Sequence, residues 1–325
     1  MATPESPSAE TRHANRKVGV ELEFGGLDLP VILQRVQDAV GGRIEQKSAY
    51  EGAVVGTSVG DVRAELDASL FRNFKLRGLL RNLALDQIEG SLEERVERAM
   101  ATEARRFVPF EVVFEPIPFS LIGDLEAVRE SLRRGAEGTG VSVFNAFGLH
   151  FNPDLPDIGP ESLLRYLRAF LCRYPSLLKR HDVDTTRRIS PFIDPFPRDY
   201  ASAVLQTEYT PDSAALIDDY IAANPTRNRP LDLLPALAWL DEERVRHHLP
   251  DEKIGRRPAL HYRLPDCRID DPDWRISHEW RHWLAIEDLA ASPSTLHRAA
   301  RGARRRLRAP LRHRLREWVS RLFKR

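Results

Sequence analysis

Two glutamates placed two positions apart begin the part of the sequence that could carry chemistry. Lys17 to Phe24 alternates apolar and polar residues, so Glu21 and Glu23 are expected on one face of a strand, about 7 Å apart. Carboxylates this close repel each other, and glutamate is poorly suited to a strand. A divalent cation would offset the repulsion, and Mg²⁺ prefers carboxylate oxygens. The pair therefore predicts a cation platform, with a solvent-facing strand edge as the alternative.

Polar side chains occupy strand positions at three further places. Each place alone is weak evidence, because a single histidine or a charged strand edge is usually structural. Four such places in one chain predict that one face of the sheet forms a site and not a core. The three places are Glu111 with Glu115, His150 with Asn152, and Asp67 with Ser69.

A set of arginines offers a second kind of chemistry. The guanidinium group is well suited to bind phosphate and carboxylate, because it presents several donors in one plane. For any single member of the set, surface solubility is the simpler explanation. The set is Arg187, Arg188, Arg198, Arg256, Arg257 and Arg263.

The elements that must position these groups alternate along the chain. Period-two patterns predict strands, and apolar residues spaced three or four apart predict helices. Strands are predicted at 17–24, 60–66, 111–117, 143–151 and 259–264. Helices are predicted at 30–40, 120–134, 160–180, 212–223 and 273–290, with another that begins at Ser91 and has Glu94 as its capping partner. Strands separated by helices, with polar residues on one strand face, indicate an α+β fold in which helices flank the sheet.

The composition excludes several classes of protein. With 42% hydrophobic and 30% charged residues, the chain of 325 residues is not wholly disordered. No run approaches the roughly 18 apolar residues of a membrane-spanning helix, and residues 1–15 lack the apolar stretch of a secretory signal. Cys172 and Cys267 are too few for a disulfide framework. We expect a cytoplasmic protein with a disordered leader (1–15), one catalytic domain (16–292) and a tail (293–325).

The tail differs from the rest of the chain in charge. Residues 298–325 contain twelve Lys or Arg and one acid, a net charge of +11, so the preceding 297 residues carry −10 of the total of +1. Leu307, Leu311, Leu315, Trp318 and Leu322 recur at helical spacing, which predicts a basic amphipathic helix. Docking within the same chain or on a partner, such as the acidic body of a neighbouring subunit in an oligomer, is favoured. Peripheral attachment to an anionic membrane and binding of nucleic acid are the alternatives.

A zinc-protease pattern appears near the end of the predicted domain. His278 and His282 stand one helical turn apart with Glu279 between them, which would make the protein a zinc metallohydrolase. Trp280 and Trp283 instead favour a helix that packs its indole rings, with the histidines at its flanks. The pattern remains an alternative, as does a non-catalytic adaptor recruited through the basic tail.

Five segments, in this order, resemble the amidoligase family, which belongs to the glutamine-synthetase-like carboxylate–amine ligases. The similarity covers about residues 16 to 290 and rests on the order and spacing of the set, since no single segment is specific. The segments are Arg16-Lys-Val-Gly-Val-Glu-Leu-Glu-Phe24, Val62-Arg-Ala-Glu-Leu-Asp-Ala-Ser-Leu70, Phe110-Glu-Val-Val-Phe-Glu-Pro-Ile-Pro118, Phe147-Gly-Leu-His-Phe-Asn152 and Tyr262-Arg-Leu-Pro-Asp266.

The resemblance implies a curved, mostly antiparallel sheet whose concave face holds ATP and metal. It also implies an activity: a carboxylate attacks the γ-phosphate of ATP, and an amine displaces phosphate from the acyl phosphate, which forms an amide or peptide-type bond. The carboxylate and amine substrates would be small molecules or peptides. The chain has no Gly-x-x-x-x-Gly-Lys-Ser/Thr motif, which agrees with this class.

The same resemblance implies roles for individual residues. Glu21, Glu23 and Glu111 would bind Mg²⁺, or Mn²⁺ as an alternative, with Glu115 less favoured than Glu111. His150 would contact metal or phosphate and take part in catalysis with Glu111 and Arg263. The residues implied in nucleotide binding are Arg187, Arg188, Arg263 and Asn152.

One position departs from the family pattern. The last strand of the superfamily usually reads Glu-x-Arg, with the Glu on metal, whereas this chain has His261-Tyr262-Arg263. A neutral histidine can bind a metal, but it removes a negative charge and suits Mg²⁺ less well. The departure predicts a changed metal preference or the loss of a second metal site.

Overall fold

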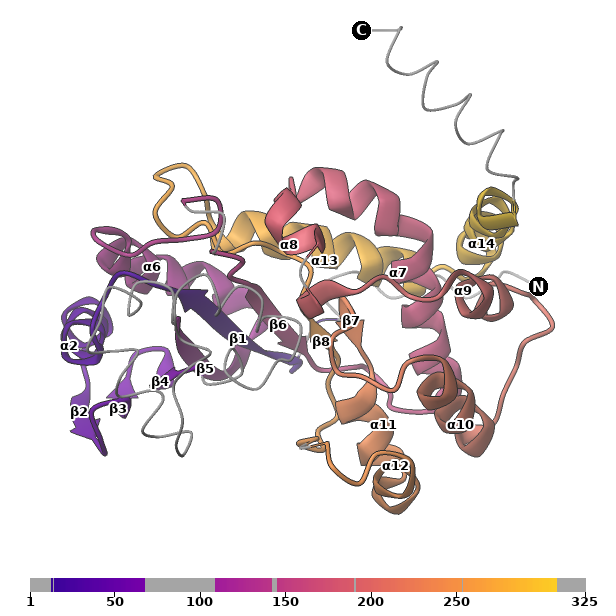
Figure 1. The fold of residues 1–325 in the computed structure, drawn as a ribbon, viewed down its shortest axis with the longest axis horizontal. Coiled ribbons are helices and arrows are strands. Elements are labelled where there is room, and N and C mark those ends of the chain that lie inside the picture. The colour runs from indigo at the N-terminus through magenta and orange to yellow at the C-terminus, as the bar shows by residue number, and fades with distance from the viewer. Residues whose placement is uncertain are drawn as a thin grey trace, which may run out of the picture.

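The fold is built on one open sheet of eight strands. A computed structural model describes residues 13, 15–67, 109–141, 145–189, 191–252 and 254–308. The strand order is β2-β3-β4-β5-β1-β6-β8-β7, and every recorded pair is antiparallel, which confirms the predicted α+β class (Figure 1). The strands are β1 (Lys17–Phe24), β2 (Arg43–Gln46), β3 (Glu51–Thr57), β4 (Gly60–Leu66), β5 (Phe110–Pro118), β6 (Leu149–Pro153), β7 (Leu231–Asp232) and β8 (His261–Tyr262).

Helices cover the apolar side of this sheet and extend beyond its β7 end. Helices α7 and α13 pack against each other, and α2 packs against α6 and against β2, β3 and β4 (Figure 1). The helices are α2 (Leu29–Val40), η3 (Phe119–Leu125), α6 (Glu126–Arg133), α7 (Pro160–Arg180), α8 (Thr185–Ile189), η4 (Pro191–Ile193), α9 (Arg198–Val204), α10 (Ser213–Ala223), α11 (Leu234–Leu240), α12 (Glu242–His248), α13 (Ile276–Ala290) and α14 (Pro293–Arg308).

The core forms on one face of the sheet because the strands alternate in polarity. On β1, Val20, Leu22 and Phe24 are fully buried, while the two glutamates between them lie on the other face. The aromatic rings of α13 close this core: Trp280 lies 5.2 Å from Phe151, between ring centroids, and Trp283 lies 5.3 Å from Tyr262. Each such buried side chain contributes about 1.5–3 kcal/mol, so this packing fixes the polar face from behind.

A buried ion pair ties the start of β1 to α13. Arg16 Nη2 lies 2.8 Å from Glu287 Oε1, and Arg16 Nη1 lies 2.9 Å from Glu287 Oε2. Glu287 also accepts hydrogen bonds from the Tyr166 hydroxyl and, at 2.9 Å, from Trp283 Nε1. The carboxylate is therefore fully engaged, which is the condition under which a buried charge is tolerated.

The last strand, β8, has only two residues and places one side chain on each face of the sheet. Its two residues alternate, so His261 lies on the polar face and Tyr262 on the core face. Tyr262 stands opposite Phe151 of β6 and Leu231 of β7, and His261 stands opposite Asp232. The predicted strand at 259–264 is thus much shorter in the structure, although Ala259 still forms an isolated bridge to Asp154.

Two further predicted elements differ from the structure. The segment at 120–134 begins as the 3₁₀ helix η3 before α6, and Gly123 within it weakens α-helical preference. The strand predicted to end before Asn152 includes Pro153, whose carbonyl oxygen accepts a hydrogen bond from Leu260 N at 3.2 Å. A proline fits there because the strand uses its carbonyl and not the missing N–H.

The described part of the tail is a helix that packs through its apolar side. In α14, Leu296, Ala300 and Ala303 are buried, and the helix contacts α7, α9 and α13. The rest of the predicted amphipathic tail, most of the predicted leader, Ser69, and the helix predicted from Ser91 lie outside the described residues. Within the described residues, no helix has both the length and the apolar character needed to cross a membrane.

Candidate functional site

The strand register gathers acidic side chains at the middle of the polar face. Glu23 of β1 stands directly opposite Glu111 of β5, which in turn stands opposite Glu65 of β4. On the other side of β1, Glu21 stands opposite His150 of β6. Three neighbouring strands thus present a row of carboxylates, and β6 adds an imidazole beside it.

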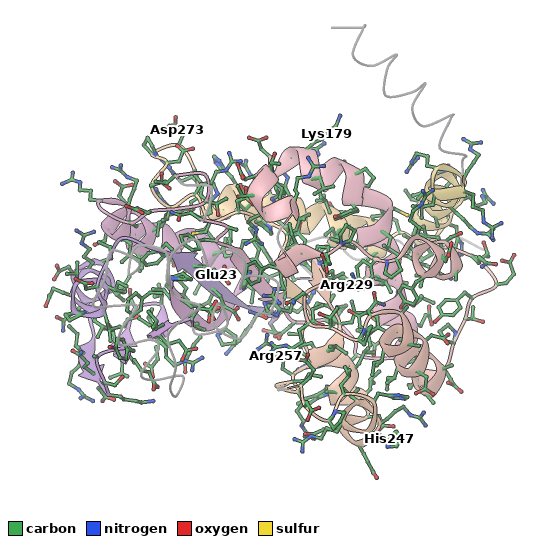
Figure 2. All side chains as sticks on the ribbon, viewed as in Figure 1. Glu23, Lys179, Arg229, His247, Arg257 and Asp273 are labelled. Carbon is green, nitrogen blue, oxygen red and sulfur yellow. The ribbon has the colours of Figure 1, made fainter. Side chains whose placement is uncertain are left out.

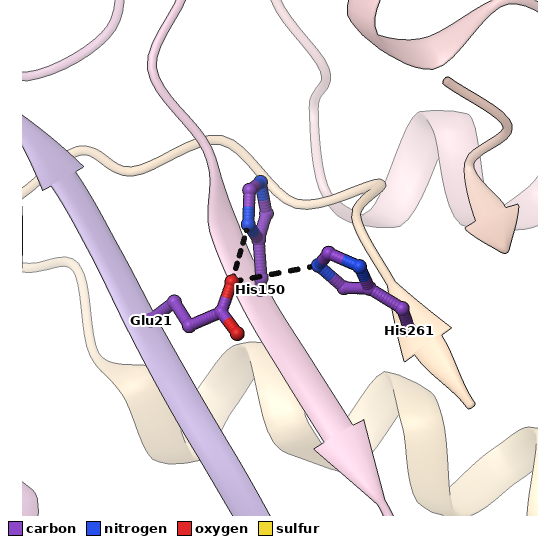
Figure 3. A group of neighbouring side chains, drawn as sticks. All are labelled: Glu21, His150 and His261. Carbon is purple, nitrogen blue, oxygen red and sulfur yellow. Dashed lines mark hydrogen bonds and ion pairs between the residues drawn. The ribbon is translucent and has the colours of Figure 1, made fainter. Parts of the chain in front are cut away.

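Glu21 is held by three side chains from two strands, and Figure 3 shows two of them, His150 and His261. Its Oε2 lies 3.0 Å from His150 Nδ1 and 3.5 Å from His261 Nε2. Its Oε1 accepts a hydrogen bond from Asn152 Nδ2 at 2.7 Å. Glu21, His150 and His261 offer ligand atoms that all lie within 4.8 Å of one another, so together they have the spacing of a metal site.

A second group of ligands shares His150 with the first. Glu23 Oε1 lies 3.4 Å from His150 Nε2, and Glu111 Oε1 lies 4.0 Å from His150 Nδ1. The other oxygen of Glu23 accepts a hydrogen bond from Gly148 N at 2.6 Å. The ligand atoms of Glu23, Glu111 and His150 again lie within 4.8 Å of one another.

Gly148 leaves the space that these side chains occupy. A Cβ atom there would lie 2.4 Å from His150 Nε2 and 2.5 Å from Arg187 Nη1. Both distances are far below van der Waals contact, so any larger residue would displace the imidazole or the guanidinium. The glycine before Leu149 and His150 is therefore a packing requirement of the site.

Burial and like charge shift the ionisation of the site residues. Burial raises the pKa of Glu111 well above its usual range, and the neighbouring carboxylates of Glu21 and Glu23 raise it further. Burial lowers the pKa of His261 to about 3, which keeps this imidazole neutral and able to donate a lone pair. The carboxylates around Glu111 therefore repel one another, and among the described residues no positive charge close to Glu111 is strong enough to offset that repulsion.

Arginines stand behind and beside the acids. Arg187 of α8 is fully buried, and its Nε lies 3.4 Å from Asp266 Oδ1 while its Nη1 lies 4.0 Å from Glu23 Oε2. It also donates from Nη2 to the carbonyl oxygen of Arg263 at 2.5 Å. Arg263 in turn donates from Nη1 to the Arg227 carbonyl oxygen at 2.9 Å. Arg187 thereby connects the acidic row to the chain segment that follows β8.

The sequence of this chain matches the model of one known protein family. Residues 14–285, most of the chain, match the family described as "Putative amidoligase enzyme". The chain belongs to this family. No curated protein and no solved structure matches it.

In this member of the amidoligase family, most residues predicted from the sequence converge, but Arg188 and Glu115 do not. Glu21, Glu23, Glu111, His150, Asn152 and His261 share the site, with Arg187 and Arg263 at its border. Arg188 is exposed on α8 and lies near Tyr174. Glu115 lies farther along β5, where it accepts from Asp61 N at 3.3 Å near the β3–β4 turn, so Glu111 is the better placed of the two acids.

The remaining arginines of the predicted set divide by location. Arg257 reaches the site, because its Nη2 donates to Asn152 Oδ1; Figure 2 shows it between the strands and helices α11 and α12. Arg256 instead pairs with Glu242 at 3.1 Å. Arg198 donates to the Leu307 carbonyl oxygen of α14. The positive charge of an arginine does not indicate whether it reaches the site, because the adjacent residues Arg256 and Arg257 contact different partners.

Sequence reasoning missed Asp232, which lies on β7 opposite His261. Its side chain is fully buried, and its Oδ1 accepts from Leu234 N at 2.9 Å. Burial raises its pKa to about 6, against the opposing charges of Arg227 and Arg263. A two-residue strand leaves no periodic pattern, so no signal in the sequence marked this acid.

The zinc-protease site, the alternative that the sequence left open, does not assemble in the structure. Of its three polar residues, Glu279 and His282 meet His181 from the end of α7, and these three offer ligand atoms within 4.8 Å of one another. His278 is not a member of the candidate metal groups in the described part of the chain. The two histidines that such an enzyme requires therefore do not share a site.

Proposed function

We propose that this protein is an ATP-dependent carboxylate–amine ligase that forms an amide bond through an acyl-phosphate intermediate. One observation carries the proposal: Glu23 and Glu111 face each other across neighbouring strands, beside Glu21 and His150, in a largely buried row. Like charges in this position are unfavourable without a cation. Membership of the amidoligase family supports ligation over other uses of such a platform.

The residues present fit a divalent cation. Glu23, Glu111 and His150 supply two carboxylates and one imidazole, a largely oxygen set that suits Mg²⁺. Glu21, His150 and His261 supply two imidazoles, which suit Mn²⁺ better than Mg²⁺. When bound, such an ion neutralises phosphate oxygens of the nucleotide.

The chain's own residues would act by position and charge. Arg263, half-buried after β8, would stabilise negative charge on the transferring phosphoryl group. Arg257 holds Asn152, and Asn152 holds the Glu21 carboxylate, so these two are positioning residues. Arg187 keeps the Glu23 side of the site in register with the segment after β8.

The proposed reaction has two displacement steps. A substrate carboxylate oxygen forms a bond to the γ-phosphorus of ATP, and the bond to the β-phosphate oxygen breaks, which releases ADP. An amine nitrogen then bonds to the acyl carbon, the bond from that carbon to the phosphate oxygen breaks, and the departing inorganic phosphate takes up the amine proton. The protein would lower both barriers by orientation and charge neutralisation.

Titration of Mg·ATP into the full chain by calorimetry tests this function. We expect saturable binding that Glu21→Gln weakens at least tenfold, because the change removes a negative charge beside His150, the residue that the two ligand groups share. Glu115→Gln is the matched control, since it alters a glutamate of β5 outside the cluster and should bind as the wild type does. A folded wild-type sample that shows no saturable binding would refute the proposal, as would unchanged binding by Glu21→Gln.

A further inference from the structure

Helix α13 carries polar groups that the proposed ligase site does not use. Glu279 and His282 project from α13 toward His181, which follows the last residue of α7. This cluster lies on the core side of β8, because His181 contacts Tyr262 and not His261. We propose that His181, Glu279 and His282 form a binding site for a divalent transition-metal ion, with Zn²⁺ as the best match.

The helix geometry supports a shared ligand set. Residues three apart on a helix lie on one face, so Glu279 and His282 point in the same direction. Glu-x-x-His on a helix is a recurrent arrangement in helical metal sites. The His181 and His282 rings meet edge to face, with 4.7 Å between centroids. Two imidazoles and one carboxylate are a common zinc donor set that leaves a fourth position open.

The surroundings of His181 match those of a metal-binding histidine. Its Nδ1 faces the Glu279 carboxylate, while its Nε2 lies 2.5 Å from the Tyr262 hydroxyl. A histidine that binds metal through one nitrogen usually places the other N–H against an oxygen, which fixes the ring orientation. Zn²⁺ bound at Nδ1 would take the place of the proton shared with Glu279, and that proton would leave to solvent.

The charges nearby allow a cation. Arg268 lies near Glu279, but its guanidinium group is engaged by Asp182 at 3.2 Å and by Asp266 at 3.6 Å. His282 is only partly buried, so an ion has a route from solvent. Arg180 and Arg281 lie near His282, and their positive charges oppose the binding of a cation there.

This assignment differs from the zinc-protease pattern in a way that can be tested. The protease pattern needs His278 and His282 as ligands, with Glu279 as the base. In the proposed site, His181 takes the place that His278 has in the protease pattern, and Glu279 is a ligand instead of a base. His278→Asn and His282→Asn, on the same helix and one turn apart, therefore form a matched pair.

The experiment is a Zn²⁺ titration of the full chain in competition with a chromogenic chelator. We expect His278→Asn to bind as many zinc ions as the wild type, and His282→Asn to bind one fewer. Glu279→Gln serves as a second variant and should lose the same ion. Because every count is relative to the wild type, zinc held by Glu21, His150 and His261 does not affect the difference.

A spectroscopic measurement adds a readout that a purely structural role would not change. With Co²⁺ in place of Zn²⁺, we expect visible absorption that decreases in His282→Asn but not in His278→Asn. Tyr262→Phe should weaken binding by about 10- to 100-fold, because it removes the oxygen that orients His181. Equal zinc stoichiometry in the wild type, His282→Asn and Glu279→Gln, each shown to be folded by circular dichroism, would overturn the proposal.

Discussion

His150 faces acidic groups with both of its ring nitrogens. Nδ1 lies 3.0 Å from Glu21, and Nε2 lies 3.4 Å from Glu23. A neutral imidazole carries one N–H, so one of these carboxylates faces a lone pair. A second proton or a metal ion removes that conflict. This single side chain therefore links the two ligand groups of the site.

Gly148→Ala tests how closely the site is packed. The added Cβ would meet His150 and Arg187, and overpacking of this kind costs about 1–3 kcal/mol. We expect lower stability in urea unfolding, together with weaker Mg·ATP binding, because the imidazole must move. Gly123→Ala is the control, since a Cβ there meets no atom within 4 Å. If both variants unfold and bind alike, the site is not packed as described.

At the scale of elements, β1 is positioned by both of its faces. The apolar residues of β1 lie in the core beneath the helices, and Arg16 at its start is tied to Glu287 of α13. The glutamates that face the site cannot move independently of this anchor. Helix α13 thus holds the strand that carries the acids, although it contributes no residue to the polar face described above.

Glu287→Gln should destabilise the protein by about 3–5 kcal/mol, because it leaves the buried Arg16 charge without its carboxylate. Urea unfolding followed by circular dichroism measures the change. Glu51→Gln is the comparison: it breaks an exposed pair with Lys47, and such surface pairs contribute little to stability. Similar midpoints for the two variants would contradict the anchoring role of Glu287.

The sequence predicts long, periodic elements best. Helix α7 has the predicted bounds, and the apolar alternation of β1 correctly placed both glutamates on one face. The β2–β3 hairpin was missed because β2 is a largely exposed four-residue strand. Asp232 and the approach of His181 to α13 depend on contacts between distant segments, which periodicity does not record. Arg257 and Arg256 show the same limit, since adjacent arginines have different partners.

At the scale of the whole molecule, positive charge gathers at one end of the chain. Helix α14 buries its apolar residues against the body and turns several arginines to solvent. The described part of this helix therefore has no free apolar side to insert into a lipid surface. Its outer side is suited to contacts governed by charge, which weaken as salt increases.

Cation-exchange chromatography at neutral pH tests this concentration of charge. We expect the full chain to be retained, although its formal net charge is only +1. A triple change of Arg298, Arg301 and Arg305 to Gln should elute at lower salt than a triple change of Arg43, Arg246 and Arg256 to Gln. Both variants lose three charges, and the second set lies away from α14. Elution of the two at the same salt would show that clustering has no effect.

Strand β8 places two different environments on either side of one peptide bond. His261 faces the acids of the proposed nucleotide site, and Tyr262 touches His181 on the opposite side. A displacement of β8 would therefore move both His261 in the proposed nucleotide site and Tyr262 beside the proposed zinc site. Thermodynamic linkage then imposes reciprocity: if zinc at His181 changes nucleotide affinity by some factor, nucleotide changes zinc affinity by the same factor. A nucleotide titration with and without zinc, and a zinc titration with and without nucleotide, would therefore give the same coupling constant, although the two sites lie on opposite sides of the sheet.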